Sequence, residues 1–183
     1  LDKDTSGLLV IAKNQKTFEF LKNEWQSGNV IKKYLALVWG RPKSESGKIE
    51  SELARSPKEF RKRIVVKPSF AKATEGKPGK NILKGKLAIT NYKVIKKFRD
   101  FSLVEVSPKT GRMHQIRVHM ASIGHPIAGD KVYGGKQKLP AGLNRQFLHA
   151  YYLSFSLSSG RKLALEADLP ADLSIVLAKL EKQ

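Results

Sequence analysis

The sequence predicts an α+β fold in which a mixed, mainly antiparallel sheet carries packed helices. Segments rich in apolar, β-branched and aromatic residues occur at 48–53, 61–67, 86–97 and 101–107, between clusters of turn-forming residues. No helical pattern separates most of these segments, which favours antiparallel pairing of consecutive strands. With 183 residues, of which 40% are hydrophobic, the chain is expected to form one sizeable domain.

The beginning of the chain is expected to contain a strand, a helix and a second strand. Residues 7–13 form a short continuous apolar run, which is typical of a strand buried on both faces. Residues 15–27 carry apolar side chains at i, i+3 and i+7, so an amphipathic helix that ends at Gly28 is predicted there. These apolar positions are Phe18, Leu21 and Trp25. Residues 33–39 are rich in strand formers, and the turn residues 40–42 close that strand.

Two further helices are predicted after residue 110. Residues 112–123 carry one apolar stripe, and Gly124 ends that helix. The stripe consists of Met113, Ile116, Met120 and Ile123. Arg117 falls at the margin of the stripe, where the stem of a long cation would be half buried. Residues 170–182 repeat leucine and valine at helical spacing and are expected to dock as a terminal helix.

Residues 68–85 differ in composition from the segments on either side. Small and turn-forming residues alternate there with lysines, a pattern that predicts a flexible insertion. The lysines could contact phosphate, but a single aromatic residue, Phe70, makes a poor platform for base stacking. We therefore expect a solvated loop whose deletion spares folding.

The charge of the chain predicts a polyanionic partner. Thirty-five Lys and Arg residues against sixteen Asp and Glu give a formal charge of +19, and the alternative is a solvated basic surface. The absence of cysteine excludes disulfides, thiolate zinc sites and cysteine nucleophiles. His114 and His119 are five residues apart and fall on different faces of a helix, so we expect no metal site. No apolar run approaches about 20 residues and no targeting segment opens the chain, so a cytoplasmic protein without membrane contact is expected.

Four segments, taken in order, match the motifs of one enzyme family. They are Leu1 to Val10, Lys33 to Ala36, Gly111 to His119 with its continuation to Gly135, and Leu148 to Ala150. The first reads Leu-Asp-Lys-Asp-Thr-Ser-Gly-Leu-Leu-Val, and the third opens with Gly-Arg-Met-His-Gln-Ile-Arg-Val-His. Together they resemble the RluA-type RNA pseudouridine synthases over nearly the whole chain. The resemblance implies the α+β fold of that family and conversion of uridine in RNA to pseudouridine with no cofactor, metal or energy source.

The resemblance implies that Asp2 is the catalytic carboxylate, acting as a nucleophile or as a base. Asp4 lies two residues further on and faces the same side of an extended chain, so spacing alone does not separate the two. Arg117 matches the family arginine that pairs with this carboxylate, and an opposite charge favours its ionised form and fixes its orientation. Arg112 is the rival arginine, although a phosphate contact at the helix start suits it better.

The remaining expected site residues would hold the RNA. Tyr34 matches the family tyrosine that stacks on the target base and assists proton removal at C5, and Leu148 matches the apolar residue on the other side of the base. Taken alone, each would be interpreted as ordinary strand or core packing. Further candidates, each weighed against simple solvation, are Arg112, His114, Lys33, Arg61 and Arg63, followed by Lys32, Arg55, Lys62 and Lys131.

The substrate and the extent of the domain follow from the same resemblance. The segment from Gly124 to Gly135 resembles family members that act on large-subunit (23S) ribosomal RNA; transfer RNA is the alternative substrate, and a non-catalytic RNA-binding fragment is the alternative function. The chain begins with Leu1 rather than Met, and the His-Arg pair that precedes this position in relatives is absent. We therefore expect residues 1–183 to be one catalytic domain without its amino-terminal strands or any RNA-binding domain. Family similarity suggests a monomer.

Overall fold

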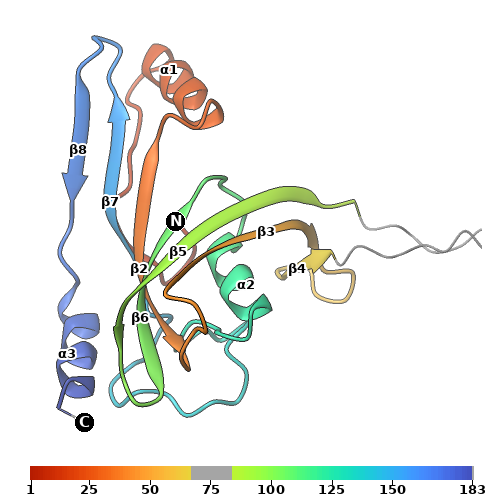
Figure 1. Ribbon diagram of the computed structural model, residues 1–183. Helices are drawn as coiled ribbons and strands as arrows, with labels where there is room; N and C mark the ends of the chain where they lie inside the picture. The colour runs from red at the N-terminus through yellow and green to blue at the C-terminus, as the bar shows by residue number, and fades with distance from the viewer. Residues whose placement is uncertain (67–83, 183) are drawn as a thin grey trace, which may run out of the picture.

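One sheet of eight strands organises the structure, a computed structural model that describes residues 1–66 and 84–182 (Figure 1). The strands are β1 (Ser6–Gly7), β2 (Ile31–Trp39), β3 (Ser46–Arg55), β4 (Arg63–Val66), β5 (Lys86–Lys97), β6 (Phe101–Pro108), β7 (Leu148–Ser156) and β8 (Lys162–Glu166). The helices are α1 (Gln15–Gln26), α2 (Gln115–Ser122) and α3 (Ala171–Leu180). Among the described strands only β1 and β7 pair in parallel, so the predicted α+β class with a mainly antiparallel sheet is confirmed.

The strand order is β1-β7-β2-β6-β5-β3-β4, and β8 also pairs with β7. β1 pairs with the beginning of β7, at residues 149–150, whereas β8 pairs with its end, at residues 152–156. The sequence analysis did not predict β7 or β8. β7 is nevertheless the strand that joins the amino-terminal residues to β2, so the position of the chain start depends on it.

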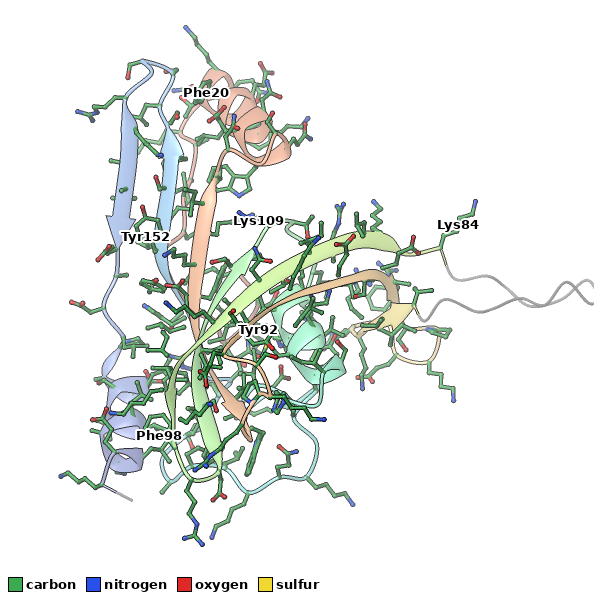
Figure 2. The ribbon with its side chains drawn as sticks, in the orientation of Figure 1. Phe20, Lys84, Tyr92, Phe98, Lys109 and Tyr152 are labelled. Atoms are coloured by element: carbon green, nitrogen blue, oxygen red, sulfur yellow. The ribbon has the colours of Figure 1, made fainter. Side chains whose placement is uncertain are left out.

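Two apolar clusters pack on opposite faces of the sheet, because neighbouring residues of a strand alternate between its faces. Ala36 and Val38 of β2 belong to the cluster that includes α2, whereas Leu37 belongs to the cluster that includes α3. Phe98, in the turn between β5 and β6, packs with the second cluster. Figure 2 shows Phe98 near α3 and Phe20, on α1, at the other end of the molecule.

Helix α1 forms as predicted, with a different buried face. Asn14 caps it by accepting a hydrogen bond from the Thr17 amide at 2.9 Å, and Gly28 adopts a φ of +76° just beyond its end. Leu21 is buried and Phe20 packs beside it, but Phe18 is 52% exposed. The inclusion of Phe18 in the buried stripe was therefore wrong, because residues 8–12 and β7 cover only the side of the helix that carries Leu21.

The expected strand at 7–13 is corrected to a two-residue strand, Ser6–Gly7, followed by residues without regular secondary structure. Beyond β1, the Leu8 amide still donates to the Ala150 carbonyl at 2.9 Å. Leu8 packs against the cluster beneath α1, whereas Leu9 and Ile11 are 65% and 79% exposed. The run is thus buried on one face rather than on both. A segment in which every residue is apolar carries no alternation, so its period could not reveal this.

Helix α2 is shorter than the predicted 112–123 helix, because His114 adopts a left-handed φ of 56° immediately before it. The Gln115 side chain closes this corner by accepting hydrogen bonds from the Arg112 amide and the Thr110 hydroxyl. Ile116 and Met120 are buried, but the ends of the predicted stripe, Met113 and Ile123, are exposed. Arg117 is buried rather than half buried.

The remaining predicted elements match the structure closely. β2, β3, β5 and β6 cover the expected strands, whereas β4 is shorter than the expected strand 61–67, and α3 lies within the predicted terminal helix. Residues 67–83 lie outside the described residues, so the expected insertion at 68–85 stays a prediction for all but residues 84 and 85. These two residues directly precede β5.

Prediction on His119. Burial lowers the pKa of His119 to about 4, and its ring contacts the Thr90 and Ser51 hydroxyls at 2.8 and 3.1 Å. In the unfolded chain the imidazole binds a proton near pH 6.5, whereas in the folded chain it stays neutral down to about pH 4. The free energy of unfolding therefore falls as the pH drops from 6.5 to 4, by up to about 3 kcal/mol. Urea unfolding of the wild-type chain and of His119→Gln measures this. The variant should show a shallower pH dependence, and equal slopes would contradict the prediction.

Candidate active site

A pocket of about 460 Å³ lies where the amino-terminal residues, β2, β7 and the corner before α2 meet. Several residues predicted from the sequence line it: Asp2, Tyr34, Arg112, His114 and Leu148. They come from positions up to 146 residues apart. Lys32 and Trp25 complete the wall on the side of α1.

The amino-terminal segment is held against β7 by backbone and side-chain contacts. The Gln146 side chain donates to the Lys3 carbonyl at 3.1 Å and to the Thr5 hydroxyl at 2.7 Å. Gly7 has a φ of +114°, and a Cβ there would stand 2.2 Å from the Ala150 carbonyl oxygen, so only glycine permits this approach. Small and hydroxyl-bearing residues after Asp2 therefore set the position of its backbone.

Asp2, rather than Asp4, contacts Arg117. The Nη1 group of Arg117 donates to Oδ2 of Asp2 at 3.3 Å, and the Asp2 side chain remains 23% exposed toward the pocket. Asp4 adopts a left-handed φ of 67°, which breaks the extended geometry assumed from its spacing, and its side chain is exposed. The structure thus distinguishes two carboxylates that spacing alone could not.

Asp130, which the sequence analysis did not single out, binds Arg117 more closely than Asp2 does. Its carboxylate accepts from Nε at 2.7 Å and from Nη2 at 2.9 Å, and its side chain is fully buried. The signal available in the sequence was an acidic residue directly after the apolar run 126–129. Burial alone would raise the pKa of Asp130, but the hydrogen bonds and charge of Arg117 hold it below its ordinary value. The same bonds outweigh burial at Arg117 and raise the pKa of its guanidinium.

Tyr34 and Leu148 face the same pocket because of the register between β2 and β7. Tyr34 pairs with Ala150, and Ala36 pairs with Leu148, so Tyr34 and Leu148 are diagonal neighbours on one face of the sheet. Burial, and after it the charge of Asp2, raises the pKa of the Tyr34 phenol. At neutral pH Tyr34 is therefore an uncharged ring with a hydroxyl group, rather than a phenolate.

His114 stands between the pocket and the segment that follows Asp130. Its Nδ1 atom lies 3.1 Å from the Tyr133 hydroxyl, and that hydroxyl also accepts the Arg63 amide at 2.8 Å. Burial, and after it the charge of Arg117, lowers the pKa of His114. The neutral imidazole can offer a substrate a hydrogen bond but no charge.

The other predicted basic residues lie in different places, and only some of them line the pocket. Lys33 lies outside the pocket, because its ammonium contacts Glu105 at 3.4 Å and stands 5.6 Å from the ring centre of Tyr152. Arg112 lines the pocket and donates through Nε to the Leu87 carbonyl at 3.3 Å. Arg63 lies on β4 and lines a separate hollow with Arg112.

A second hollow, of about 390 Å³, adjoins the pocket across Met113 and His114, which line both. Most of its charged lining residues are basic, with Lys3, Arg61 and Lys131 beside Arg117, and Asp4 lines it as well. Both Arg61 and Lys131 are exposed, so their charges are available to a ligand. The site thus consists of a pocket with a carboxylate and a neighbouring hollow with cations.

The described part of the chain offers no group of three or more His, Cys, Asp or Glu side chains that could hold a metal ion. Within the same residues, no helix has both the length and the apolar character that crossing a membrane requires.

A sequence profile of the family described as RNA pseudouridylate synthase matches residues 1–122. The chain belongs to this family. The matched segment contains Asp2, Tyr34 and Arg117, whereas Asp130 and Leu148 lie beyond it.

Individual relatives extend the similarity over almost the whole chain. An uncharacterized RNA pseudouridine synthase of Chloroflexus aurantiacus is 43% identical over 182 residues, which cover 99% of this chain and 52% of that protein. The ribosomal large subunit pseudouridine synthase C of Rickettsia prowazekii is 41% identical over 173 residues, which cover 93% and 52%. The structure of human RNA pseudouridylate synthase domain containing 4 matches with a TM-score of 0.80 at 27% identity, over 99% of this chain and 74% of that one. The chain spans about half the length of the curated relatives it matches.

Prediction on the buried ion pair. Arg117→Met leaves the Asp130 charge buried without its partner, so the free energy of unfolding should fall by about 3 to 5 kcal/mol. In Arg117→Met with Asp130→Asn the unpaired charge is gone, and the loss should be smaller. Denaturant unfolding of the two variants beside wild type measures both effects. A double variant less stable than Arg117→Met would contradict the prediction.

Proposed function

We propose that this chain converts uridine in RNA to pseudouridine, with Asp2 as the catalytic carboxylate. In this isomerisation the bond between N1 and C1′ breaks, a bond between C5 and C1′ forms, the proton on C5 leaves, and N1 gains one. The observation that supports the proposal is the Asp2 carboxylate, open to a pocket and 3.3 Å from a buried guanidinium, in a member of this family. A nucleophilic role and a basic role both require a carboxylate held in a fixed position, and the hydrogen bond that Nη1 of Arg117 donates to Oδ2 of Asp2 supplies such a contact.

The shape of the pocket supports binding of an unstacked base. No protein group can reach C1′ while a uridine stays in its stack, so the target must swing out of the RNA helix. The Tyr34 ring offers one face for stacking, and Leu148 offers an aliphatic surface beside it. Because the Tyr34 phenol keeps its proton at neutral pH, we assign it stacking and hydrogen bonding rather than the role of a phenolate base.

We infer that the basic hollow beside the pocket binds the RNA backbone next to the flipped nucleotide. Arg61 and Lys131 are exposed there, and the formal charge of +19 favours a polyanion. The Rickettsia relative carries the name of a large-subunit ribosomal enzyme, which supports large-subunit ribosomal RNA as the substrate. Transfer RNA remains the alternative. A monomer acting in the cytoplasm belongs to the same proposal.

We further propose that residues 1–183 act as one catalytic domain. β7, which lies outside the matched residues 1–122, pairs with both β1 and β2 and supplies Leu148 to the pocket. Neither the first residues of the chain nor β7 could therefore be removed without dismantling the site.

Prediction on Asp2. Asp2→Asn should reduce isomerisation by about a thousandfold or more, because the amide can act neither as a base nor as a nucleophile. Tritium release from RNA labelled at uridine C5 measures the rate on a large-subunit ribosomal transcript and on transfer RNA. Asp4→Asn is the matched control for turnover at saturating RNA, since the exposed Asp4 side chain lines the neighbouring hollow instead of the pocket and asparagine tolerates the left-handed backbone. Wild-type chain that binds RNA but releases no tritium would instead indicate a non-catalytic RNA-binding module.

Prediction on the basic hollow. Arg61→Gln and Lys131→Gln should each weaken RNA binding and lower the slope of log affinity against log salt by about one, because each removes a phosphate contact. The turnover at saturating RNA should stay close to wild type. Lys162→Gln, an exposed lysine on β8, is the control. Filter binding between low and moderate salt would contradict the prediction if all three slopes equal the wild-type value.

A further inference from the structure

The guanidinium of Arg117 lies between two carboxylates and forms more and shorter hydrogen bonds to one of them than to the other. Asp130 accepts from Nε and Nη2 at 2.7 and 2.9 Å, whereas Asp2 accepts from Nη1 alone at 3.3 Å. Guanidinium–carboxylate pairs are commonly bidentate, with two parallel hydrogen bonds. Here the bidentate partner is the carboxylate that a substrate cannot reach, since the Asp130 side chain is fully buried.

We propose that Asp130 is a positioning residue that occupies the fork of Arg117, so that the arginine orients Asp2 through a single N–H without closing on it as a bidentate ion pair. This inference rests on the proposed function, in which Asp2 is the reacting group. An arginine free to form two short bonds to Asp2 would turn the carboxylate oxygens toward itself and away from the pocket.

The surroundings of Asp130 fix the plane in which it presents its oxygens. Oδ1 accepts the backbone N–H groups of Val132 and Tyr133 at 2.8 and 3.0 Å, which ties the carboxylate to the turn that follows it. The ring of Tyr133 lies beside the Arg117 guanidinium, 5.3 Å from ring centre to the central carbon. Asp130 and the Tyr133 ring therefore restrain Arg117 from two sides, independently of its contact with Asp2.

The exposed fractions of the three side chains show in which direction the restraint acts. Arg117 is 6% exposed and Asp130 is 0% exposed, whereas Asp2 is 23% exposed and lines the pocket. The buried pair is the rigid part, and Asp2 is the group that a substrate can touch. Asp130 acts on the reaction only through Arg117.

Asp130→Asn disturbs the contact with Arg117 while it preserves the hydrogen bonds to the turn that follows residue 130. The asparagine Oδ1 can still accept the amides of Val132 and Tyr133 and the Nη2 group of Arg117, whereas its NH₂ group meets the Nε–H of Arg117 as a second donor, so the bidentate contact is lost. We expect kcat for tritium release to fall by about a hundredfold, as for a catalytic group displaced by about 1 Å. KM for RNA should stay within about twofold of wild type, because Asp130 does not reach the surface.

A second measurement follows the arginine itself and does not depend on turnover. In amide and guanidinium NMR spectra, the Arg117 Nε–H should exchange slowly with water in wild type and lose that protection in Asp130→Asn. The matched control is Glu181→Gln, which removes the same charge from another carboxylate paired with a cation, Lys96–Glu181, at the surface and outside both the pocket and the basic hollow. It should leave both kcat and the Arg117 signal unchanged.

The outcomes separate the inference from the function on which it rests. Loss of Arg117 protection with kcat within about twofold of wild type would overturn the positioning role alone, as would unchanged protection. An inactive wild-type chain would overturn the proposed function and the inference with it. Should Asp130→Asn fail to fold, the single-turnover rate of Arg117→Met is compared with that of Arg117→Met combined with Asp130→Asn. Equal rates support the inference, because Asp130 then has no arginine to hold, and a further loss overturns it.

Discussion

The buried contact between Arg117 and Asp130 is the constraint on which the arrangement of the site depends. It joins α2 to the turn after residue 129, and Tyr133 from that turn extends it toward β4 through the Arg63 amide. Such a pair contributes little net stability over apolar side chains of equal volume, yet removing one partner alone is costly. Its clearest consequence is a guanidinium that reaches Asp2 from a fixed direction.

A second constraint comes from β7, which brings the first residues of the chain to the same place. The close approach of Gly7 to Ala150 and the hydrogen bonds from Gln146 hold residues 3–7 beside this strand. The other side of β7 pairs with β2, and that register sets Tyr34 beside Leu148. One strand therefore positions the carboxylate and both surfaces that we propose to contact the base.

Local sequence signals predicted most elements, and they failed where burial depends on distant segments. The apolar spacing and Gly28 predicted α1 on local grounds, but the exposure of Phe18 depends on which segments cover the helix. The apolar run after Gly7 gave no period, so its one-sided burial could not be predicted. Helix α2 begins three residues later than predicted because a left-handed His114 precedes it, and the raised frequency of histidine in that conformation is too small to predict it at one position.

The sequence by itself determined the fold class, the strongly basic charge and the motifs that single out Asp2, Tyr34 and Arg117. A motif can single out such residues because the chemistry of a reaction constrains their type and local spacing. The tertiary structure decided that Asp130 binds Arg117, that Asp2 rather than Asp4 contacts this arginine and that Lys33 turns toward Glu105 instead of the pocket. These outcomes depend on which side chains the sheet register and the turn after residue 129 bring within hydrogen-bonding distance, and a one-residue change of register reverses the face on which a side chain lies.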